Sequence, residues 1–346
     1  MRRANICNMP IRKLLCILVF HAFINSLSVG AENPAESVEL LERTFKSADI
    51  RSSGTSSYRL SAKLQMWREG KVLNEGKYLL FGDPSGKWRE EIVFSGYTRF
   101  RIGNEHNYWQ VRSVDFEPLP ILEIDEFLDF PRTLKTAEKV SLSSPFKRKS
   151  SGIEYRCVDA QVEFSHKQTF CIDPQSGNLT SISNDFKGFE TPDRVTYVQY
   201  SNFRKVADRI FPGKIEGFRG KKLILEIEFD EMKELPQNSP EDFTPPQNAA
   251  RWLYCSVPAS SKVDLHPHPE YPKSARDSRT QGMVTLYVVI DENGKTSSPH
   301  VLQSAGNALD EATIQAVSQW RYNQPICGDV KAPVETTVSA LFTLMQ

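Results

Sequence analysis

The sequence lacks the signatures of the common enzyme and nucleic-acid-binding classes. It has no GxSxG, HExxH, P-loop or GxGxxG pattern, and therefore no recognisable nucleophile elbow, zinc-protease helix or phosphate-binding loop. Its 43 basic and 43 acidic side chains cancel, so no excess positive charge is available to attract nucleic acid. No CxxC pair suggests a zinc ribbon or a redox site. We expect a protein that is not an enzyme and needs no cofactor.

A metal site is not expected either. His266 and His268 flank Pro267, which holds the backbone extended, so the two imidazoles need not converge. No cluster of cysteines or carboxylates lies near them in the sequence. We interpret this segment as a surface loop.

The length of the chain indicates more than one domain. Domains usually contain roughly 100–200 residues, whereas this chain has 346, of which 39% are hydrophobic. We expect four segments: a signal peptide at 1–31, an antiparallel β-rich domain at 32–234, a proline-rich linker at 235–264 and a small domain at 265–346. The fold class is therefore α+β.

The first segment is typical of an export signal. Arg12 and Lys13 precede an apolar stretch from Leu14 to Ile24, which is too short for a spanning helix of roughly 20 residues. Small residues end at Ala31, where we place the cleavage site. This predicts export to the periplasm. The alternative is an uncleaved leader that anchors the chain in the inner membrane.

Alternating side chains dominate the second segment. A helix should begin after Asn33, with Val38, Leu41 and Phe45 on one face. A half-buried strand follows, in which Tyr58 to Met66 alternate with polar neighbours. Further strands are expected at Thr98–Ile102, His106–Arg112, Gly152–Ala160, Gln168–Ile172, Leu179–Ser183, Arg194–Tyr200, Arg209–Phe218 and Lys222–Phe229, with a helix at Leu119–Leu128. Short turns between strands predict an antiparallel meander.

The pattern changes again after the proline-rich segment. Val284, Leu286, Val288 and Ile290 alternate along a strand, which a turn at Asp291–Gly294 should connect to a second strand at Lys295–Leu302. A helix is expected at Asp310–Arg321 and a final alternating strand at Val334–Phe342. The order strand, strand, helix, strand predicts a small ββαβ domain.

Export makes the cysteines informative. Beyond the leader there are four, at Cys157, Cys171, Cys255 and Cys327, and an even number in an oxidising compartment indicates two disulfides. Four cysteines allow three connectivities. We favour Cys157–Cys171 and Cys255–Cys327, because each pair then stays within one expected domain. Four buried free thiols are the alternative.

Spaced motifs in the last segment resemble the C-terminal domain of the TonB family. The pattern runs from Tyr271-Pro272-x-x-Ala275-Arg276 through Gln281-Gly282-x-Val284 and Asp291-x-x-Gly294 to Leu309-Asp310-x-Ala312 and Trp320-Arg321-Tyr322. One departure is visible, because Asn323 and Gln324 precede Pro325 where the family usually has proline sooner. Each motif residue also has a structural explanation in turns or core, so the resemblance implies a fold more strongly than an activity.

A fainter resemblance concerns the β-rich segment. Phe81-Gly82-x-Pro84-x-Gly86-Lys87-Trp88-Arg89, an N-terminal helix and a long meander are similar to LolA-like lipoprotein carriers. In such folds a half-barrel sheet and a helix enclose an apolar hollow that can hold acyl chains. The alternative is an ordinary packed core.

The two resemblances imply two different functions. The TonB-type domain would bind an extended peptide of an outer-membrane TonB-dependent transporter by adding it as a strand, and we expect the edge to be the strand that carries Val334, Thr336, Val338, Ala340 and Phe342. The alternative is a periplasmic lipid or lipoprotein carrier whose TonB-like domain only docks it to another envelope protein. An anchored energy transducer is less consistent with the leader, because Ile17 stands one turn before His21 where that family has serine.

Overall fold

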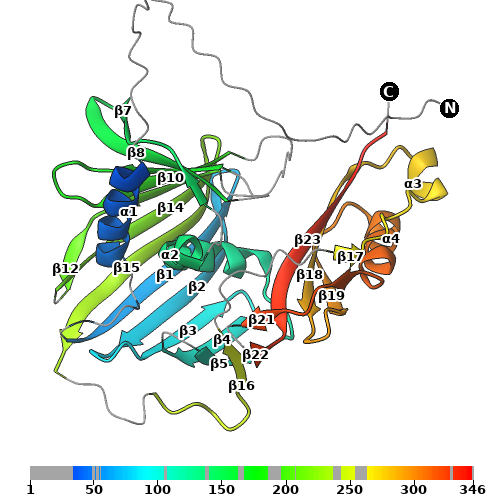
Figure 1. Ribbon diagram of the computed structural model, residues 1–346, viewed down its shortest axis with the longest axis horizontal. Helices are drawn as coiled ribbons and strands as arrows, with labels where there is room; N and C mark the ends of the chain where they lie inside the picture. The colour runs from blue at the N-terminus through cyan, green and yellow to red at the C-terminus, as the bar shows by residue number, and fades with distance from the viewer. Residues whose placement is uncertain are drawn as a thin grey trace, which may run out of the picture. The chain divides into compact units, whose positions relative to one another are not determined.

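The computed structural model (Figure 1) describes most of the chain after the expected leader. The described residues are 34–48, 51, 54, 56–104, 107–136, 140–162, 167–185, 196–206, 208–236, 243–253, 263–327 and 330–344. The expected signal peptide at 1–31 lies outside these ranges. Among the described helices, none is both long enough and apolar enough to cross a membrane.

Antiparallel strands form most of the region from residue 34 to residue 253, here called the β-rich region. Helices α1 (Pro34–Ala48) and α2 (Leu119–Thr136) accompany them. The strands are β1 (Ser57–Arg68), β2 (Lys71–Gly82), β3 (Trp88–Phe94), β4 (Tyr97–Gly103), β5 (Asn107–Arg112), β6 (Val140–Leu142), β7 (Phe146–Ser150), β8 (Ile153–Val162), β9 (Lys167–Ile172), β10 (Leu179–Asp185), β11 (Tyr197–Ser201), β12 (Arg204–Val206), β13 (Arg209–Phe211), β14 (Lys214–Arg219), β15 (Lys222–Leu235) and β16 (Ala250–Leu253).

One large sheet contains 14 of these strands, in the order β16-β5-β4-β3-β2-β1-β15-β14-β11-β10-β9-β8-β6, with β7 beside β8. Most neighbours in the sheet are also neighbours in sequence, because short turns join them. The pairings of β1 with β15 and of β5 with β16 join strands that are far apart in the sequence. The predicted antiparallel sheet is confirmed.

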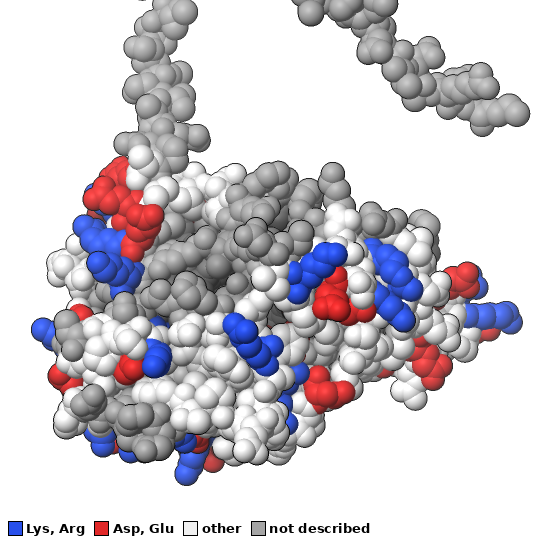
Figure 2. Space-filling view, turned by 60° about the horizontal axis from the view of Figure 1, so that its bottom comes forward, with Lys and Arg blue, Asp and Glu red and all other residues white. Residues whose placement is uncertain are grey.

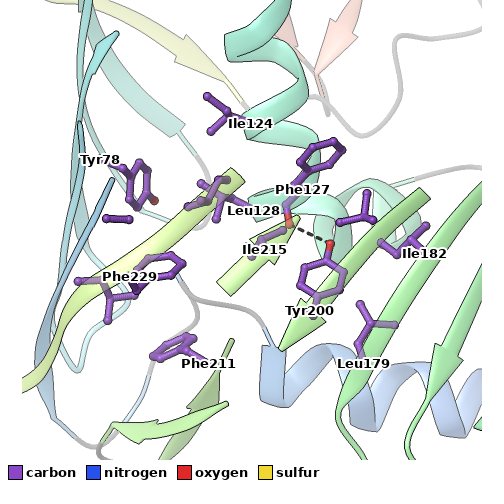
Figure 3. Close-up of a cluster of buried hydrophobic side chains, with 14 of the residues drawn as sticks. Tyr78, Ile124, Phe127, Leu128, Leu179, Ile182, Tyr200, Phe211, Ile215 and Phe229 are labelled. Atoms are coloured by element: carbon purple, nitrogen blue, oxygen red, sulfur yellow. Dashed lines mark hydrogen bonds between the residues drawn. The ribbon is translucent and has the colours of Figure 1, made fainter. Parts of the chain in front are cut away.

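Period-two alternation places one face of this sheet in a hydrophobic core. In β1, Tyr58, Leu60, Ala62 and Leu64 are all at most 2% exposed. Helix α2 supplies Ile124, Phe127 and Leu128, which point toward sheet residues such as Tyr78, Ile182, Ile215 and Phe229 (Figure 3). The Tyr200 hydroxyl donates a hydrogen bond of 3.2 Å to the carbonyl oxygen of Phe127. The helix therefore packs into the covered face of the sheet.

Helix α1 begins where the Asn-Pro signal places it but turns a different face inward. Leu41 and Phe45 are buried as predicted, whereas Val38 is 42% exposed. The inward positions are instead Ser37, Leu40, Leu41, Thr44 and Phe45. The Ser37 hydroxyl donates a hydrogen bond of 2.6 Å to the carbonyl oxygen of Ser143. This polar contact turns the helix, so apolar spacing alone did not identify its buried face.

Two further segments differ from the sequence-based expectation. The single strand predicted at Arg209–Phe218 is divided into β13 and β14. Pro212 between them cannot donate to a ladder, and the Gly213 N–H donates 3.0 Å hydrogen bonds to the carbonyl oxygens of Ser201 and Asn202. Within the proline-rich segment, β16 pairs with β5 and extends the large sheet. That stretch of the expected linker is therefore ordered as a strand.

The C-terminal segment from residue 263 to 344, here called the C-terminal module, combines short helices with a small sheet. Its elements are β17 (Val263–Leu265), α3 (Lys273–Asp277), β18 (Gly282–Ile290), β19 (Thr296–Gln303), α4 (Asn307–Val317), β20 (Arg321–Tyr322), β21 (Ile326–Cys327), β22 (Val330–Lys331) and β23 (Val334–Phe342). The strand order in its three-stranded sheet is β19-β18-β23. Helix α4 lies against β18 and β19 (Figure 1). This small β/α module agrees with the prediction, although α4 begins three residues earlier and ends four residues sooner than expected.

The structure contains the predicted disulfide between Cys157 and Cys171. The two residues face each other directly across β8 and β9, with their Cα atoms 4.1 Å apart. Both are buried in the sheet. Cys255 lies outside the described residues, so its pairing with Cys327 stays a prediction.

Removing the first disulfide should lower stability without changing the fold. Replacing Cys157 and Cys171 together with alanine frees a loop of about 15 residues in the unfolded chain, which corresponds to about 3 kcal/mol. Urea unfolding of the oxidised wild type and of the double variant measures the difference. Equal free energies of unfolding would show that the pair is reduced in the native protein.

Candidate functional site

Strand β23 is an edge strand of the three-stranded sheet in the C-terminal module, and it carries the residues that the sequence analysis predicted to bind a partner. Its alternate residues Val338 and Phe342 face the core of the module, where they are 9% and 5% exposed. Val334, Thr336 and Ala340 occupy the other positions on the same face of the strand. Every residue from Val334 to Phe342 pairs with β18, and among the described residues no strand pairs with the other side of β23. One row of main-chain groups is therefore left at the edge.

The two edges of this sheet differ in how they could accept another strand. On β19, Pro299 lacks an N–H group and Ser298 has a positive φ of 49°, so this edge is irregular. β23 contains neither proline nor lysine, and β-branched residues make up four of its nine positions (Val334, Thr336, Thr337 and Val338). Proline and irregularity are features with which proteins protect an edge. β23 is therefore the edge more suitable for strand addition.

The motif glycines lie where a side chain would collide. Gly294 has φ of 81°, and a Cβ there would lie 1.8 Å from the carbonyl oxygen of Tyr322. Its own carbonyl accepts a 2.7 Å hydrogen bond from the Tyr322 N–H, which ties the hairpin turn to β20. At Gly282, with φ of 154°, a Cβ would lie 2.9 Å from the Cβ of Ala305. Both glycines are required by the fold.

The first motif, Tyr271 to Arg276, attaches helix α3 to the sheet. The Tyr271 hydroxyl donates a hydrogen bond to the carbonyl oxygen of Thr280, and its ring lies 5.4 Å from that of Phe342. Pro272 precedes α3 and accepts a 3.0 Å hydrogen bond from the Arg276 N–H. Ala275 is 3% exposed in the module core. These residues fix the C-terminal end of β23 against α3.

The second motif group surrounds helix α4. Leu309 is fully buried, and Asp310 accepts hydrogen bonds from Ser304 Oγ at 2.5 Å and from the Ala305 N–H at 3.1 Å. The Trp320 indole donates a 3.0 Å hydrogen bond to the carbonyl oxygen of Pro267. Arg321 pairs with Leu265 across β20 and β17. All of the motif residues therefore have structural roles.

His266 and His268 do not form a metal site with other residues of the described chain. The ring of His266 lies 3.7 Å from that of Trp320, and the two imidazoles are 5.4 Å apart and perpendicular. Burial and the neighbouring His268 lower the pKa of His266. No group of three His, Cys, Asp or Glu side chains that could hold a metal ion occurs among the described residues.

A buried ion network occupies the core-facing side of β3 and β4. The guanidinium of Arg99 is fully buried and contacts Glu90 at 2.6 Å, Glu117 at 3.2 Å and Asp125 at 2.6 Å. Arg51 also pairs with Glu90, while Arg101 contacts Glu117 and Asp125 at 3.0 Å each. The Tyr97 hydroxyl donates a 2.6 Å hydrogen bond to Glu117. Because Asp125 lies on α2, the network binds this helix to the sheet.

Burial and the neighbouring arginines shift the pKa values of these carboxylates in opposite directions. Burial alone would raise the pKa of Asp125, but Arg99 and Arg101 outweigh this effect and hold the pKa well below its ordinary value. The pKa of Glu90 is lowered for the same reason, by Arg51 and Arg99. Both groups are therefore charged at neutral pH, and their chemistry is that of a structural network.

Replacing Asp125 with asparagine should destabilise the β-rich region. Arg99 and Arg101 would lose a buried partner, which typically costs about 3–5 kcal/mol. A carboxylate with a depressed pKa stabilises the fold fully above its unfolded pKa of about 4, and this contribution is lost as the pH falls toward the folded pKa. The variant should therefore lose less stability than the wild type between about pH 4 and pH 2.

Urea unfolding at neutral and acidic pH measures the loss of stability and its dependence on pH. Asp277→Asn is the matched control, because that carboxylate pairs with Lys273 on the surface and its side chain is 65% exposed. Exposed pairs contribute about 0–1 kcal/mol. A loss for Asp125→Asn no larger than that of the control would contradict the assigned role of the network.

One cavity, of about 580 Å³, adjoins the first turn of α2. Its apolar lining includes Met66, Trp67, Leu73, Leu119, Ile224 and Leu302. Arg68, Arg219 and Lys222 add positive charge, and Glu69 and Glu123 add negative charge. The cavity is therefore amphipathic, with apolar walls between charged groups.

Among the described residues on the face seen in Figure 2, basic and acidic side chains are interspersed with uncharged ones. This distribution agrees with the net charge of zero for the whole sequence.

Comparison with known proteins confirms the resemblance of the C-terminal module. Residues 267–344 match the family of Gram-negative bacterial TonB protein C-terminal domains. Over 86 residues the chain is 37% identical to Protein TonB of Xanthomonas campestris pv. campestris, in strains B100 and ATCC 33913. The match covers 23% of this chain and 38% of that protein. The C-terminal module is thus of the TonB type, and the chain matches less than half the length of these relatives.

Several solved structures align with part of the chain at low sequence identity. One is a putative outer membrane lipoprotein-sorting protein domain from Vibrio parahaemolyticus, with a TM-score of 0.39, 10% identity, and coverage of 59% of this chain and 97% of that one. Another is a LolA superfamily protein from Nitrosomonas europaea, with a TM-score of 0.40, 8% identity, and coverage of 60% and 97%. MucB is similar over 62% of this chain, with a TM-score of 0.28.

The residues that form the ion network were not predicted from the sequence. Glu90 occupies an inward position of β3, which is why the alternation from Trp88 to Phe94 is less regular than in β1. Arg99 and Arg101 likewise occupy inward positions of β4. Charges of opposite sign at the inward positions of neighbouring strands were the available signal, because side chains there must pair.

Proposed function

We propose that the C-terminal module binds an extended peptide of an envelope protein by strand addition at β23. The peptide of an outer-membrane TonB-dependent transporter is the partner that the TonB-type match favours. The observation that supports this proposal is the position of β23 at an edge of its sheet, without the proline that interrupts β19. Main-chain hydrogen bonds would supply affinity, and the outward side chains would supply selectivity.

Two adjacent proline variants test this edge. Successive residues of a strand direct their N–H groups to opposite sides, so one of Val338→Pro and Ser339→Pro removes an outward N–H and the other removes a bond to β18. The variant that removes the outward group should keep its fold and bind peptide about tenfold more weakly, since one hydrogen bond contributes about 1 kcal/mol and the bent edge adds to the loss.

Binding is measured with synthetic peptides from the periplasmic N-terminal segments of TonB-dependent transporters, and folding by circular dichroism. Val301→Pro in β19 is the matched control, because it places proline at a 37% exposed position on the opposite edge. If both β23 variants fold and bind as the wild type does, or if Val301→Pro alone weakens binding, β23 is not the accepting edge.

The cavity beside α2 supports a second candidate function for the β-rich region, that of a lipid or lipoprotein carrier. Its volume of about 580 Å³ lies within the range of small-molecule sites, roughly 300–1,000 Å³. Apolar walls beside Arg68 and Lys222 suit an acyl chain with an anionic head group. In this case the C-terminal module would dock the carrier to an envelope partner.

Filling the cavity should then displace the lipid. Leu73 lines the cavity and is 53% exposed, so Leu73→Trp can occupy space without disturbing the core. Protein purified from envelopes is extracted and its lipid is quantified by mass spectrometry. Val93→Trp is the control, because Val93 is also 53% exposed but does not line the cavity. Absence of lipid from the wild type, or equal lipid in both variants, would exclude the carrier function at this site.

A further inference from the structure

The central strand of the C-terminal module is buried on both faces. Val284, Leu286 and Val288 pack toward the core formed with α4. The alternate residues Met283, Thr285 and Tyr287 point to the other face, yet they are only 5%, 4% and 1% exposed. A three-stranded sheet with a helix on one face would leave these side chains in solvent, so something else covers them.

Residues of the β-rich region provide this cover at Tyr287. Residues 33–346 form one compact unit, and within it the Tyr287 hydroxyl lies 3.4 Å from Nη1 of Arg112. The ring of Phe116 lies 6.4 Å from that of Tyr287 and stacks on His300 of β19 at 4.6 Å. Asp115 Oδ1 is 3.2 Å from Nε2 of His300. The segment that follows β5 therefore lies over the outer face of the small sheet.

An ion pair extends this contact to the peptide-accepting strand. Nη2 of Arg112 lies 2.8 Å from Oε1 of Glu335 in β23, and the two side chains are 11% and 14% exposed. Burial and the charge of Glu335 raise the pKa of Tyr287, so its hydroxyl stays protonated between these two groups. Arg112 is also 3.3 Å from Glu117, which belongs to the buried ion network. The network thus continues from the β-rich region into the C-terminal module.

Glu335 contributes a carboxylate of the C-terminal module to this network. Described ion pairs connect the guanidinium groups of Arg51, Arg99, Arg101 and Arg112 with the carboxylates of Glu90, Glu117 and Asp125, and Arg112 also pairs with Glu335. Buried ions that lose a partner are costly, so the Arg112–Glu335 pair favours the docked arrangement.

The contact covers only the first part of the outer face of β23. Outward-facing residues of β23 become more exposed along the strand: the Glu335 side chain is 14% exposed, Thr337 is half-buried, and Leu341 is 56% exposed. A peptide strand added beside Val334–Thr337 would direct alternate side chains toward the covering segment, whereas one beside Ser339–Phe342 would not.

We infer that docking of the β-rich region on the outer face of the small sheet is an autoinhibitory contact, which restricts peptide addition to the second half of β23. This inference rests on the proposed function of β23 and names its regulation. Release of the Arg112–Glu335 pair and of the Phe116 contact would open the whole strand. An event in the β-rich region that moves the segment after β5 would then control how firmly the peptide is held.

Two variants on opposite sides of the contact test the inference. Glu335→Arg places two positive charges against each other, and Phe116→Ala removes the stacking on His300 without changing the accepting strand. Hydroxyl-radical footprinting reports the side-chain exposure of Tyr287 in the full-length protein, and peptide affinity is measured separately with the same transporter peptides. We expect both variants to oxidise faster at Tyr287 and to bind peptide about tenfold more tightly.

Matched controls isolate the contact from general effects of substitution. Val114→Ala shortens a 39% exposed residue of the same segment, and Glu292→Gln removes an exposed charge from the turn before β19. Both should behave as the wild type. Rapid oxidation of Tyr287 in the wild type would overturn the docked arrangement, and exposure of Tyr287 without a gain in peptide affinity would overturn the autoinhibition. If no form of the protein binds peptide, the proposed function itself fails, while the footprints still report docking.

Discussion

A fully buried arginine is the constraint on which much of this structure depends. Arg99 can remain charged in the core only if carboxylates surround it, and they come from three separate parts of the chain: Glu90 on β3, Glu117 after β5 and Asp125 on α2. Satisfying one guanidinium therefore fixes the position of a helix on a sheet and of a loop beside it. Hydrophobic burial alone, which has no direction, would not specify that arrangement.

The same constraint reaches the C-terminal module through Arg112. Because Arg112, at the end of β5, contacts both Glu117 and Glu335, the core network is connected to β23, the strand proposed to bind peptide. The contact of the Phe116 ring with Tyr287 adds buried apolar area, but it does not fix the orientation of the two parts as an ion pair does. Charge pairing therefore selects the face on which the β-rich region and the module meet, and burial stabilises the contact once it forms.

The sequence predicted the elements that depend on local chemistry. Period-two alternation located β1 and β23, and the Asp-Glu-Asn-Gly turn located the hairpin before β19. The Cys157–Cys171 disulfide was predicted because both cysteines lie within one expected domain. Features that depend on contacts between residues far apart in the sequence were not predicted. The exposed position of Val38 reflects a hydrogen bond between Ser37 and Ser143, more than one hundred residues away, and no local pattern encodes that contact.

The near-continuous apolar sequence of β18 could have predicted that both faces of this strand are buried. Reading only Val284, Leu286, Val288 and Ile290 predicts one buried face, but Met283, Tyr287 and Val289 fill the alternate positions with apolar or aromatic side chains as well. A strand that is apolar on both faces is buried on both faces, and a lone small domain has nothing to cover the second. The sequence of β18 therefore already implies a partner for the C-terminal module, and the structure supplies that partner from the same chain.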